Sequence, residues 1–298
     1  MTLRITQGMM NIQLIRNLNN NLARIDNRQN QLATGRKINR PSDDPVGITY
    51  SLRYRSELTI NAQYQRNLDM ALTWLDFTDS MLNEAGNILH RAYELAIRGS
   101  NGTNPPEALY AIKQEIDELY AQMVEVANSQ LNGKYVFNGQ KTDVKPYDAA
   151  NAAQAVTDSY QIQFEVIQGV LVPINLTGND VFGAPNDPMN TFQILKDLSN
   201  ALGNNNHTAV KNLSEKIQQR MDAILAFRSE IGARVNRVEL IESRLKDMNV
   251  HLNSLQAKTE DADMAELITK LKMDENVYNA SLAVGARVIT PSLVDFLK

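Results

Sequence analysis

The sequence predicts a mainly α-helical protein: an elongated helical bundle of long antiparallel helices, formed by both chain ends, with a small β-rich insertion. Apolar residues recur at steps of three and four over long stretches, which is the spacing of a helix face that packs on a partner. Alternating apolar residues, typical of strands, are confined to one short region. The 298 residues are 43% hydrophobic but only 6% aromatic, with one Trp and 14 Gly, which favours long helices over a β-sandwich.

The first predicted helix lies between about residues 5 and 35. This segment is rich in Asn, a mediocre helix former, so its helicity alone should be marginal and it needs a partner to fold. Its apolar residues follow the helical spacing: Ile15, Leu18, Leu22, Ile25 and Leu32.

The two ends of the chain carry opposite charge. Residues 1–40 hold seven Lys or Arg against one Asp, whereas residues 258–275 hold three Lys against six Asp or Glu. Opposite charge and apolar faces together predict that the terminal helices, about 5–35 and 262–297, pair antiparallel and line a tubular assembly.

The segment 33–47 predicts a helix stop, a basic turn and a helix start. Gly35 suits a left-handed C-cap. Pro45 suits a first helical position, with Asp44 as the N-cap acceptor and Asp43 favoured by the positive end of the helix dipole. Three basic residues in the turn are expected to be exposed and to contact a neighbouring subunit: Arg36, Lys37 and Arg40.

Three core helices are predicted over about residues 45–98, 105–131 and 207–257. Asn104 and Glu107 resemble a capping box at the second, and its short connection to the first implies an antiparallel hairpin. The first seam is Leu68, Leu72, Leu75, Leu82, Leu89, Tyr93 and Ala96, interrupted by Asp79 and Gly86. The second is Leu109, Ile112, Ile116, Leu119, Met123 and Val126. The third is Ile224, Phe227, Ile231, Val238, Ile241, Leu245, Met248, Leu252 and Leu255, interrupted by Arg234.

A β-rich insertion interrupts this pattern. The expected elements are a strand at 135–137, a turn at 138–139, strands at 160–166 and 170–172, and a turn at 168–169 between them. Asp187 and Pro188 predict a restart of helix as N-cap and first residue. The last helix is predicted to open over residues 259–262.

The elements are therefore nested, and we expect three domains. Residues 1–40 and 260–298 form terminal coiled-coil helices of an inner tube domain. Residues 41–139 and 188–259 form a helical core domain, and residues 140–187 a β-rich outer domain. No apolar run reaches a membrane span or a signal-peptide core.

Nothing in the sequence indicates catalysis, and no cofactor or metal is predicted. His90, His207 and His251 are far apart and follow no ligand spacing, and the chain has no Cys. A net charge of −4 argues against a dedicated nucleic-acid binder. The adjacent Asp43 and Asp44 are better explained by capping than by acid–base chemistry.

Several ordered motifs resemble the bacterial flagellin superfamily. They are Arg4-Ile5-Thr6 with Met9-Met10, then residues 36–47, then Asn132-Gly133-Lys134-Tyr135-Val136-Phe137-Asn138-Gly139, and finally the stretch from Glu275-Asn276-Val277-Tyr278 to Phe296-Leu297. Arg40-Pro41 and Asp44-Pro45 look more like the superfamily's hook–filament junction proteins than like filament flagellin.

The resemblance implies a structural component of the flagellum that joins hook to filament and forms a platform for flagellin assembly. The implied partners are further copies of the chain in a ring, a proximal junction protein, flagellin and a cytoplasmic export chaperone, with type III export to the extracellular flagellum. The alternatives are a flagellin filament subunit and, from a different class, a cytoplasmic coiled-coil adaptor. The candidate assembly residues are Ile15, Leu18, Leu22, Ile25, Arg36, Arg40, Ile268, Leu271, Tyr278 and Leu282.

Overall fold

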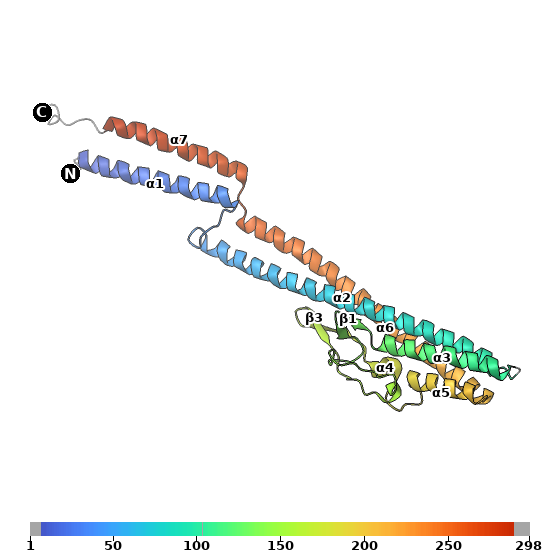
Figure 1. Cartoon of the computed structure of the whole chain (residues 1–298). Coiled ribbons are helices and arrows are strands. Elements are labelled where there is room, and N and C mark those ends of the chain that lie inside the picture. Colours follow the sequence, from blue (N-terminus) through green and yellow to red (C-terminus); the bar gives the residue numbers. More distant parts are fainter. Residues whose placement is uncertain (1–6, 103, 289–298) are drawn as a thin grey trace. The chain divides into compact units, whose positions relative to one another are not determined.

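The computed structural model describes residues 7–102 and 104–288, which form seven α-helices and two two-stranded sheets (Figure 1). The chain divides into two compact units, one of residues 1–60 and 248–298 and the other of residues 61–247. Two long helices, α2 (Pro45–Ser100) and α6 (His207–Glu260), contribute to both units. The mainly α-helical fold is confirmed, with long helices from both chain ends packing together. The division into three domains stays a prediction.

In the first unit, α1 (Gln7–Thr34) and α7 (Met264–Val288) lie side by side and run antiparallel (Figure 1). We call these two helices the terminal pair. Gly285 of α7 approaches the side chain of Leu14 so closely that a Cβ atom there would lie 2.8 Å from Leu14 Cδ2. Residues 1–6 and 289–298, which belong to the predicted terminal helices, lie outside the described residues.

The turn between α1 and α2 follows the predicted capping at two positions. Gly35 adopts a φ of +69°, and the Asp44 carboxylate accepts hydrogen bonds from the Val46 and Gly47 amides. Asp43 does something else: its carboxylate accepts from the amides of Asn39 and Arg40 at 3.0 and 2.8 Å. Asp43 therefore closes the turn itself, because its side chain points back along the linker.

Helices α2, α3 (Pro106–Ala127), α5 (Thr191–Gly203) and α6 supply most of the apolar core of the second unit. All the predicted seam residues of α3 are buried, and so are Leu68, Leu75, Leu82, Leu89 and Ala96 of α2. The predicted capping box at α3 is wrong. Pro105 is the N-cap residue, with no side-chain cap, because the Asn104 side chain donates back to the Arg98 carbonyl at 2.5 Å.

The α6 seam is buried at Ile224, Ile231, Val238, Leu245 and Leu252. Met248 and Leu255 are exposed, so the seam prediction is wrong at these two positions. Both lie in the first unit, in the part of α6 where only Leu252 and Glu260 are buried, so a narrower face of the helix is covered there. The helix also continues through Glu260, and α7 begins only at Met264, where Asp263 accepts from the Ala265 and Glu266 amides. The predicted helix start at 259–262 is therefore wrong.

The inserted region contains two short hairpins. β3 (Gln163–Ile167) and β4 (Val170–Pro173) pair antiparallel around the turn at 168–169, as predicted. β1 (Gln130–Leu131) and β2 (Lys134–Tyr135) pair around Asn132 and Gly133, whose φ values of 52° and 78° suit a tight hairpin turn. The predicted strand at 135–137 is wrong, because the chain leaves the sheet after Tyr135 and buries Val136 and Phe137.

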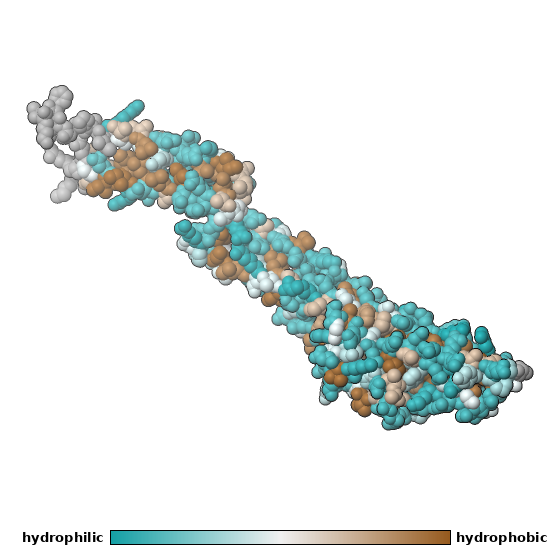
Figure 2. All heavy atoms as spheres, in the orientation of Figure 1, coloured by the Kyte–Doolittle hydropathy of each residue, from teal (hydrophilic) through white to brown (hydrophobic). Residues whose placement is uncertain are grey.

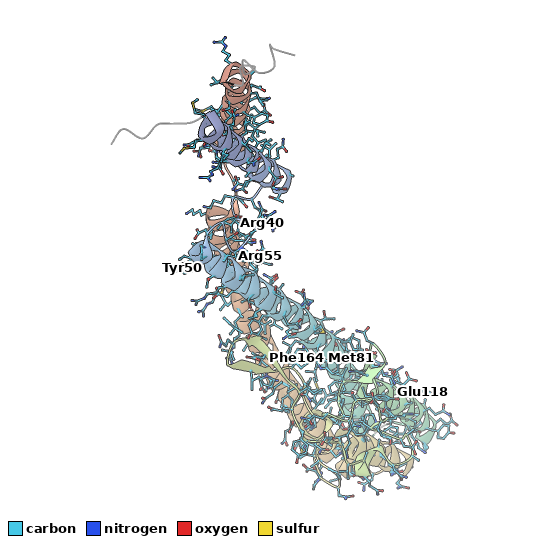
Figure 3. All side chains as sticks on the ribbon, turned by 90° about the vertical axis from the view of Figure 1, so that its left-hand side faces the viewer. Arg40, Tyr50, Arg55, Met81, Glu118 and Phe164 are labelled. Atoms are coloured by element: carbon cyan, nitrogen blue, oxygen red, sulfur yellow. The ribbon has the colours of Figure 1, made fainter. Side chains whose placement is uncertain are left out.

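Two elements of this region were not predicted, namely α4 (Gly178–Phe182) and a 3-10 turn (Ala152–Gln154). The helix predicted to start at Pro188 begins instead at Thr191, because the Asn190 side chain caps it by accepting from the Phe192 and Gln193 amides. The β3–β4 hairpin lies beside α2, where Asn67 donates to the Glu165 carbonyl at 2.8 Å; Phe164 of β3 is labelled in Figure 3.

An aromatic cluster forms the core of the inserted region: Phe137, Tyr147, Phe182 and Phe192 contact one another, with ring centroids 4.9 to 5.7 Å apart. Burial raises the pKa of the Tyr147 hydroxyl. Burial lowers the pKa of Arg220, which reaches from α6 to donate to the Val181 carbonyl in α4. This buried cation ties the inserted region to the helical core.

Candidate assembly site

The terminal pair is joined by polar contacts as well as by apolar ones. Arg24 and Arg28 of α1 lie 3.5 and 3.9 Å from the Asp274 carboxylate of α7. Asn21 donates to the Ser281 hydroxyl at 3.1 Å. The opposite charge of the two chain ends is thus used within one subunit, as the sequence predicts.

The apolar assembly residues predicted on the terminal pair fall into two groups. Leu18, Ile25, Leu271 and Tyr278 are partly buried. Ile15, Leu22, Ile268 and Leu282 are exposed, by 57% in the case of Ile15. Figure 2 shows the resulting brown apolar surface on both helices, interleaved with hydrophilic residues. Further exposed apolar side chains of the pair are Met9, Met10, Ile12, Met264, Met273, Val277 and Val284.

Sequence reasoning missed the most buried residues of the terminal pair. Asn21 and Gln31 of α1 and Leu267 of α7 are all buried. The Gln31 side chain donates to the Lys37 carbonyl at 2.8 Å, which ties the end of α1 to the linker that follows. The terminal helices were predicted from the spacing of apolar residues. That spacing carries no information about Asn21 and Gln31, which are polar and are buried through hydrogen bonds.

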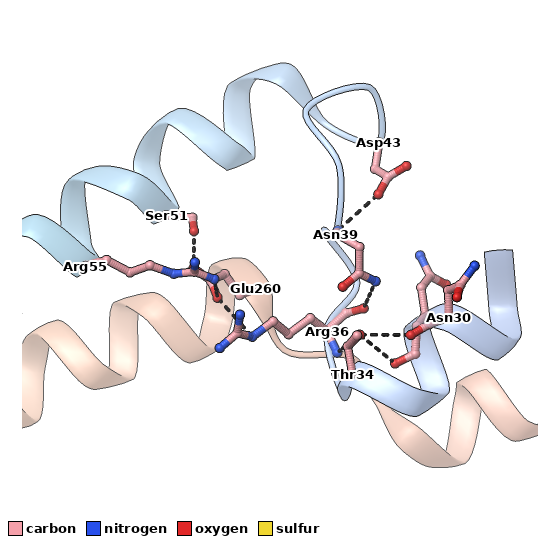
Figure 4. Close-up of polar contacts among 9 residues, drawn as sticks. Asn30, Thr34, Arg36, Asn39, Asp43, Ser51, Arg55 and Glu260 are labelled. Atoms are coloured by element: carbon pink, nitrogen blue, oxygen red, sulfur yellow. Dashed lines mark hydrogen bonds and ion pairs between the residues drawn. The ribbon is translucent and has the colours of Figure 1, made fainter.

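A second set of contacts lies where α1 leads into α2 and α6 leads into α7 (Figure 4). The Glu260 carboxylate, on a residue that is only 1% exposed, accepts from Arg55 Nε at 2.8 Å and from Arg55 Nη2 at 2.5 Å. The Ser51 hydroxyl also donates to it, and Arg36 Nε lies 3.4 Å away. We call Arg36, Ser51, Arg55 and Glu260 the linker cluster.

The charge of Glu260 is stabilised in this setting. Burial by itself acts to raise the pKa of the carboxyl, but hydrogen bonds from Arg55 and Ser51 and the charges of Arg55 and Arg36 outweigh it. The pKa of Glu260 therefore lies below its ordinary value, and the carboxylate is ionised at neutral pH.

The three basic residues of the linker, predicted as subunit contacts, differ in surroundings. Arg36 is exposed in part, yet its guanidinium pairs with Glu260 and its backbone bridges to Asp261. Lys37 donates through Nζ to the Lys258 carbonyl at 2.9 Å. Arg40 is exposed, and its backbone amide, not its side chain, is held by Asp43. Figure 3 labels Arg40 and Arg55 near this turn.

The described residues offer no group of three or more His, Asp or Glu side chains placed to hold a metal ion. His90 lies exposed beside Glu94, and His207 contacts the Gly99 carbonyl through Nδ1 at 3.1 Å. Among the described helices, none combines the length and apolar character needed to cross a bilayer.

Two family models match the chain at its two ends. The bacterial flagellin N-terminal helical region matches residues 5–142, and the bacterial flagellin C-terminal helical region matches residues 214–297. These matches include both helices of the terminal pair, all of α2 and most of α6, and they leave out most of the inserted region. Fold and matches together define a flagellin-type helical protein whose two ends pair with each other.

The chain belongs to the bacterial flagellin family. It is 25% identical to a flagellin of Halalkalibacterium halodurans, over 91% of this chain and 90% of that relative. It is 24% identical to flagellar hook-associated protein 3 of Escherichia coli K12, over 94% of this chain and 95% of that relative.

Solved structures show the same fold. A putative flagellar hook-associated protein of Vibrio parahaemolyticus superposes with a TM-score of 0.67 at 21% identity, covering 74% of this chain and all of that one. FlgL of Bacillus cereus superposes with a TM-score of 0.60 at 24% identity, covering 69% of this chain and 99% of that one.

Proposed function

We propose that this chain is a structural component of the bacterial flagellum that forms the junction between hook and filament, like hook-associated protein 3, and is the platform on which flagellin assembles. The terminal pair carries the proposal. Within a family of flagellar proteins, it leaves apolar side chains exposed on both helices, Ile15 and Ile268 among them. Exposed apolar surface of this kind marks a protein–protein interface.

Two observations favour the junction over the filament. Relatives named flagellar hook-associated protein 3, from Escherichia coli and Salmonella typhimurium, align over 95% of their own length. By the resemblance of the sequence to the superfamily, Pro45 and Val46 also stand where filament flagellins typically have Ala.

A junction must satisfy different neighbours at its two axial faces, so its contacts with them are heterologous. We infer a ring of copies of this chain, with the proximal junction protein on one side and flagellin on the other. Residues 1–40 and 260–298 would form the inner tube domain, residues 41–139 and 188–259 the helical core domain, and residues 140–187 the outer domain. A cytoplasmic chaperone and type III export would deliver the chain to the extracellular flagellum, where its role is mechanical and not catalytic.

The second candidate is a filament subunit. It is favoured by the flagellin of Halalkalibacterium halodurans, which matches this chain along nearly its whole length. The two candidates differ in what a cell loses when the chain is absent, because a junction protein is needed before any flagellin can be retained.

The test is a deletion strain examined by electron microscopy and by assay of flagellin in the medium. The junction proposal expects intact hooks, absent filaments and flagellin lost to the medium. Normal filaments would contradict it, and loss of filament mass with no flagellin in the medium would identify a filament subunit.

Labelling the chain on intact cells gives an independent readout. A band between hook and filament supports the junction, whereas signal along the filament identifies the filament subunit. Signal confined to the cytoplasm contradicts both and supports the coiled-coil adaptor.

A further inference from the structure

We propose that Glu260 is a positioning residue: its buried carboxylate holds the two linkers together and thereby fixes the direction in which the terminal pair leaves the first turns of α2 and the last turns of α6. Glu260, the terminal pair and the first turns of α2 all lie in the first unit of the chain. Its consequence for the flagellum rests on the proposed function, because the terminal pair is the part that would contact neighbouring subunits.

The geometry of the linker cluster carries this inference (Figure 4). Arg55 and Ser51 of α2 bind the Glu260 carboxylate from one side, and Arg36, in the first linker, lies 3.4 Å from Oε2. One side chain at the end of α6 thus touches both the start of α2 and the chain that leaves α1.

Backbone hydrogen bonds connect the two linkers beside the linker cluster. The Lys37 amide donates to the Glu260 carbonyl at 2.7 Å, and the Ala262 amide donates to the Gly35 carbonyl at 3.0 Å. The two linkers, 35–44 and 261–263, are therefore tied to each other. Ile38 of the first linker is buried as well, so that linker is held from two sides.

Glu260 is needed for this arrangement because burial makes its contacts obligatory. A buried carboxylate must be paired and hydrogen-bonded, and removing one partner of such a pair leaves the other uncompensated. The geometry is also specific, since a bidentate Arg–carboxylate pair fixes orientation as well as distance. An apolar side chain in place of Glu260 would fill the same volume, but it would not fix the positions of Arg36 and Arg55.

The terminal pair has contacts of its own that do not involve the linker cluster. Asn21 bonds Ser281, and Arg24 and Arg28 pair with Asp274. Loss of Glu260 should therefore leave α1 paired with α7 and free only the direction of the pair. This separation distinguishes a positioning role from a general contribution to folding.

The chain has no Cys, so a spin label attaches only at the two Cys residues that are introduced in each variant. Asn20→Cys with Ser56→Cys reports on the terminal pair relative to α2, since both residues are exposed and lie in the first unit. Asn17→Cys with Asn279→Cys reports on the distance between α1 and α7. Distance distributions are measured by pulsed electron paramagnetic resonance on the full chain.

In Glu260→Gln we expect the distribution between positions 20 and 56 to become about twofold broader, while that between 17 and 279 stays unchanged, since hinge motion alters only the first. The matched control is Glu57→Gln, which removes the same charge from a partly exposed carboxylate paired with Arg53 at 2.9 Å. Its distributions should equal those of the unaltered chain.

The proposal is overturned if Glu260→Gln leaves the 20–56 distribution narrow, or if both distributions broaden together. Arg55→Lys is the second variant, since it keeps the charge but loses the bidentate fork. It should broaden the 20–56 distribution by a smaller amount, and an unchanged distribution would count against the proposal. Because all measurements use the isolated subunit, they stand even if the deletion strain identifies the chain as a filament subunit.

Discussion

Arg55 and Glu260 form a bidentate ion pair across 205 positions of sequence, with the Arg55 nitrogens 2.8 and 2.5 Å from the two carboxylate oxygens. The pair joins the third turn of α2 to the last residue of α6. Its two partners are unequal, since the Arg55 side chain is 39% exposed and the Glu260 side chain 1%. Removing Arg55 should therefore lower stability more than removing Glu260, because it leaves a buried carboxylate without its main partner.

Low pH should weaken the contacts of Glu260 in the linker cluster. The pKa of Glu260 lies below its ordinary value of 4.5, so its contribution to stability is full above that value and is lost as the pH falls through the pKa of the folded state. The groups that face it are Arg55 and Ser51 from α2 and Arg36 from the linker, and the two arginines stay charged throughout.

The measurement is the distance distribution between labels at positions 20 and 56, taken over a series of pH values falling from about pH 6. The unaltered chain should show a broader distribution in acid. Glu260→Gln should already be broad at the higher pH and change little. If the unaltered chain and Glu260→Gln showed the same distribution at every pH, the carboxylate charge would not be what orders the linker cluster.

Arg36 and Arg40 should respond differently to charge reversal, although the sequence places them in one basic cluster. Arg36→Glu puts a second carboxylate beside Glu260. We expect it to lower the free energy of unfolding by about 1 kcal/mol, and no more because water screens the half-exposed position 36. Arg40→Glu should leave stability unchanged, since the Arg40 side chain is exposed. Urea denaturation of both variants tests this, and equal stability of the two would contradict it.

The core seam is tested by matched substitutions in α6. Leu245 is 1% exposed and Leu240 is 74% exposed. Leu245→Asp should cost roughly 4 kcal/mol or more, because it removes apolar contacts and buries an unpaired carboxylate. Leu240→Asp should change the free energy of unfolding by no more than about 0.5 kcal/mol. Urea denaturation followed by circular dichroism distinguishes them, and similar midpoints would exclude the seam.

Local signals in the sequence were sufficient to predict most helices and two of the caps. Gly35 and Asp44 act through their own backbone or the next turn, so the residue type alone predicts their role. Leu109 and Ile116 were predictable because one helix face repeats every three or four residues. The caps predicted at Asn104 and Asp187 were wrong. The Asn104 side chain bonds the Arg98 carbonyl instead, and Asn190 caps the helix that was predicted to begin after Asp187. Residue type alone does not show which of several nearby polar groups a side chain will bond.

The linker cluster could not have been predicted in this way. Glu260 looked like part of a helix start, and nothing near it in sequence indicates that Ser51 and Arg55 would meet it. On the terminal pair, the adjacent Leu267 and Ile268 are both apolar, yet only Leu267 is buried. Which of two neighbouring apolar residues faces the partner helix depends on its rotation, and that depends on polar contacts such as the one between Asn21 and Ser281.

The ion pairs of the terminal pair should contribute measurably to its stability. Asp274→Asn removes the acceptor of both Arg24 and Arg28, and we expect α1 amides to exchange hydrogen about threefold faster, because partly exposed ion pairs contribute below about 1 kcal/mol. Glu275→Gln is the matched control, since Glu275 pairs with Lys272 on its own helix. Hydrogen exchange read by mass spectrometry makes the comparison, and equal rates in the two variants would refute the contribution.

Exposed apolar residues of the terminal pair should matter for assembly and not for the stability of the subunit. Ile15 is exposed, whereas Leu18, one turn away on the same helix, is partly buried. Ile15→Ser should change the free energy of unfolding by only a few tenths of a kcal/mol, at most about 0.5, because it removes little buried surface. Leu18→Ser should lower it further by loosening the contact with α7.

In cells, Ile15→Ser should reduce the amount of the chain recovered in sheared flagella, while the exported chain accumulates in the medium. Asn19→Ser, an exposed polar position on α1, is the control and should be incorporated normally. Immunoblots of cells, medium and sheared flagella give the distribution. Normal incorporation of Ile15→Ser would show that this face is not an assembly interface, and retention of the variant inside the cell would assign the residue to export instead.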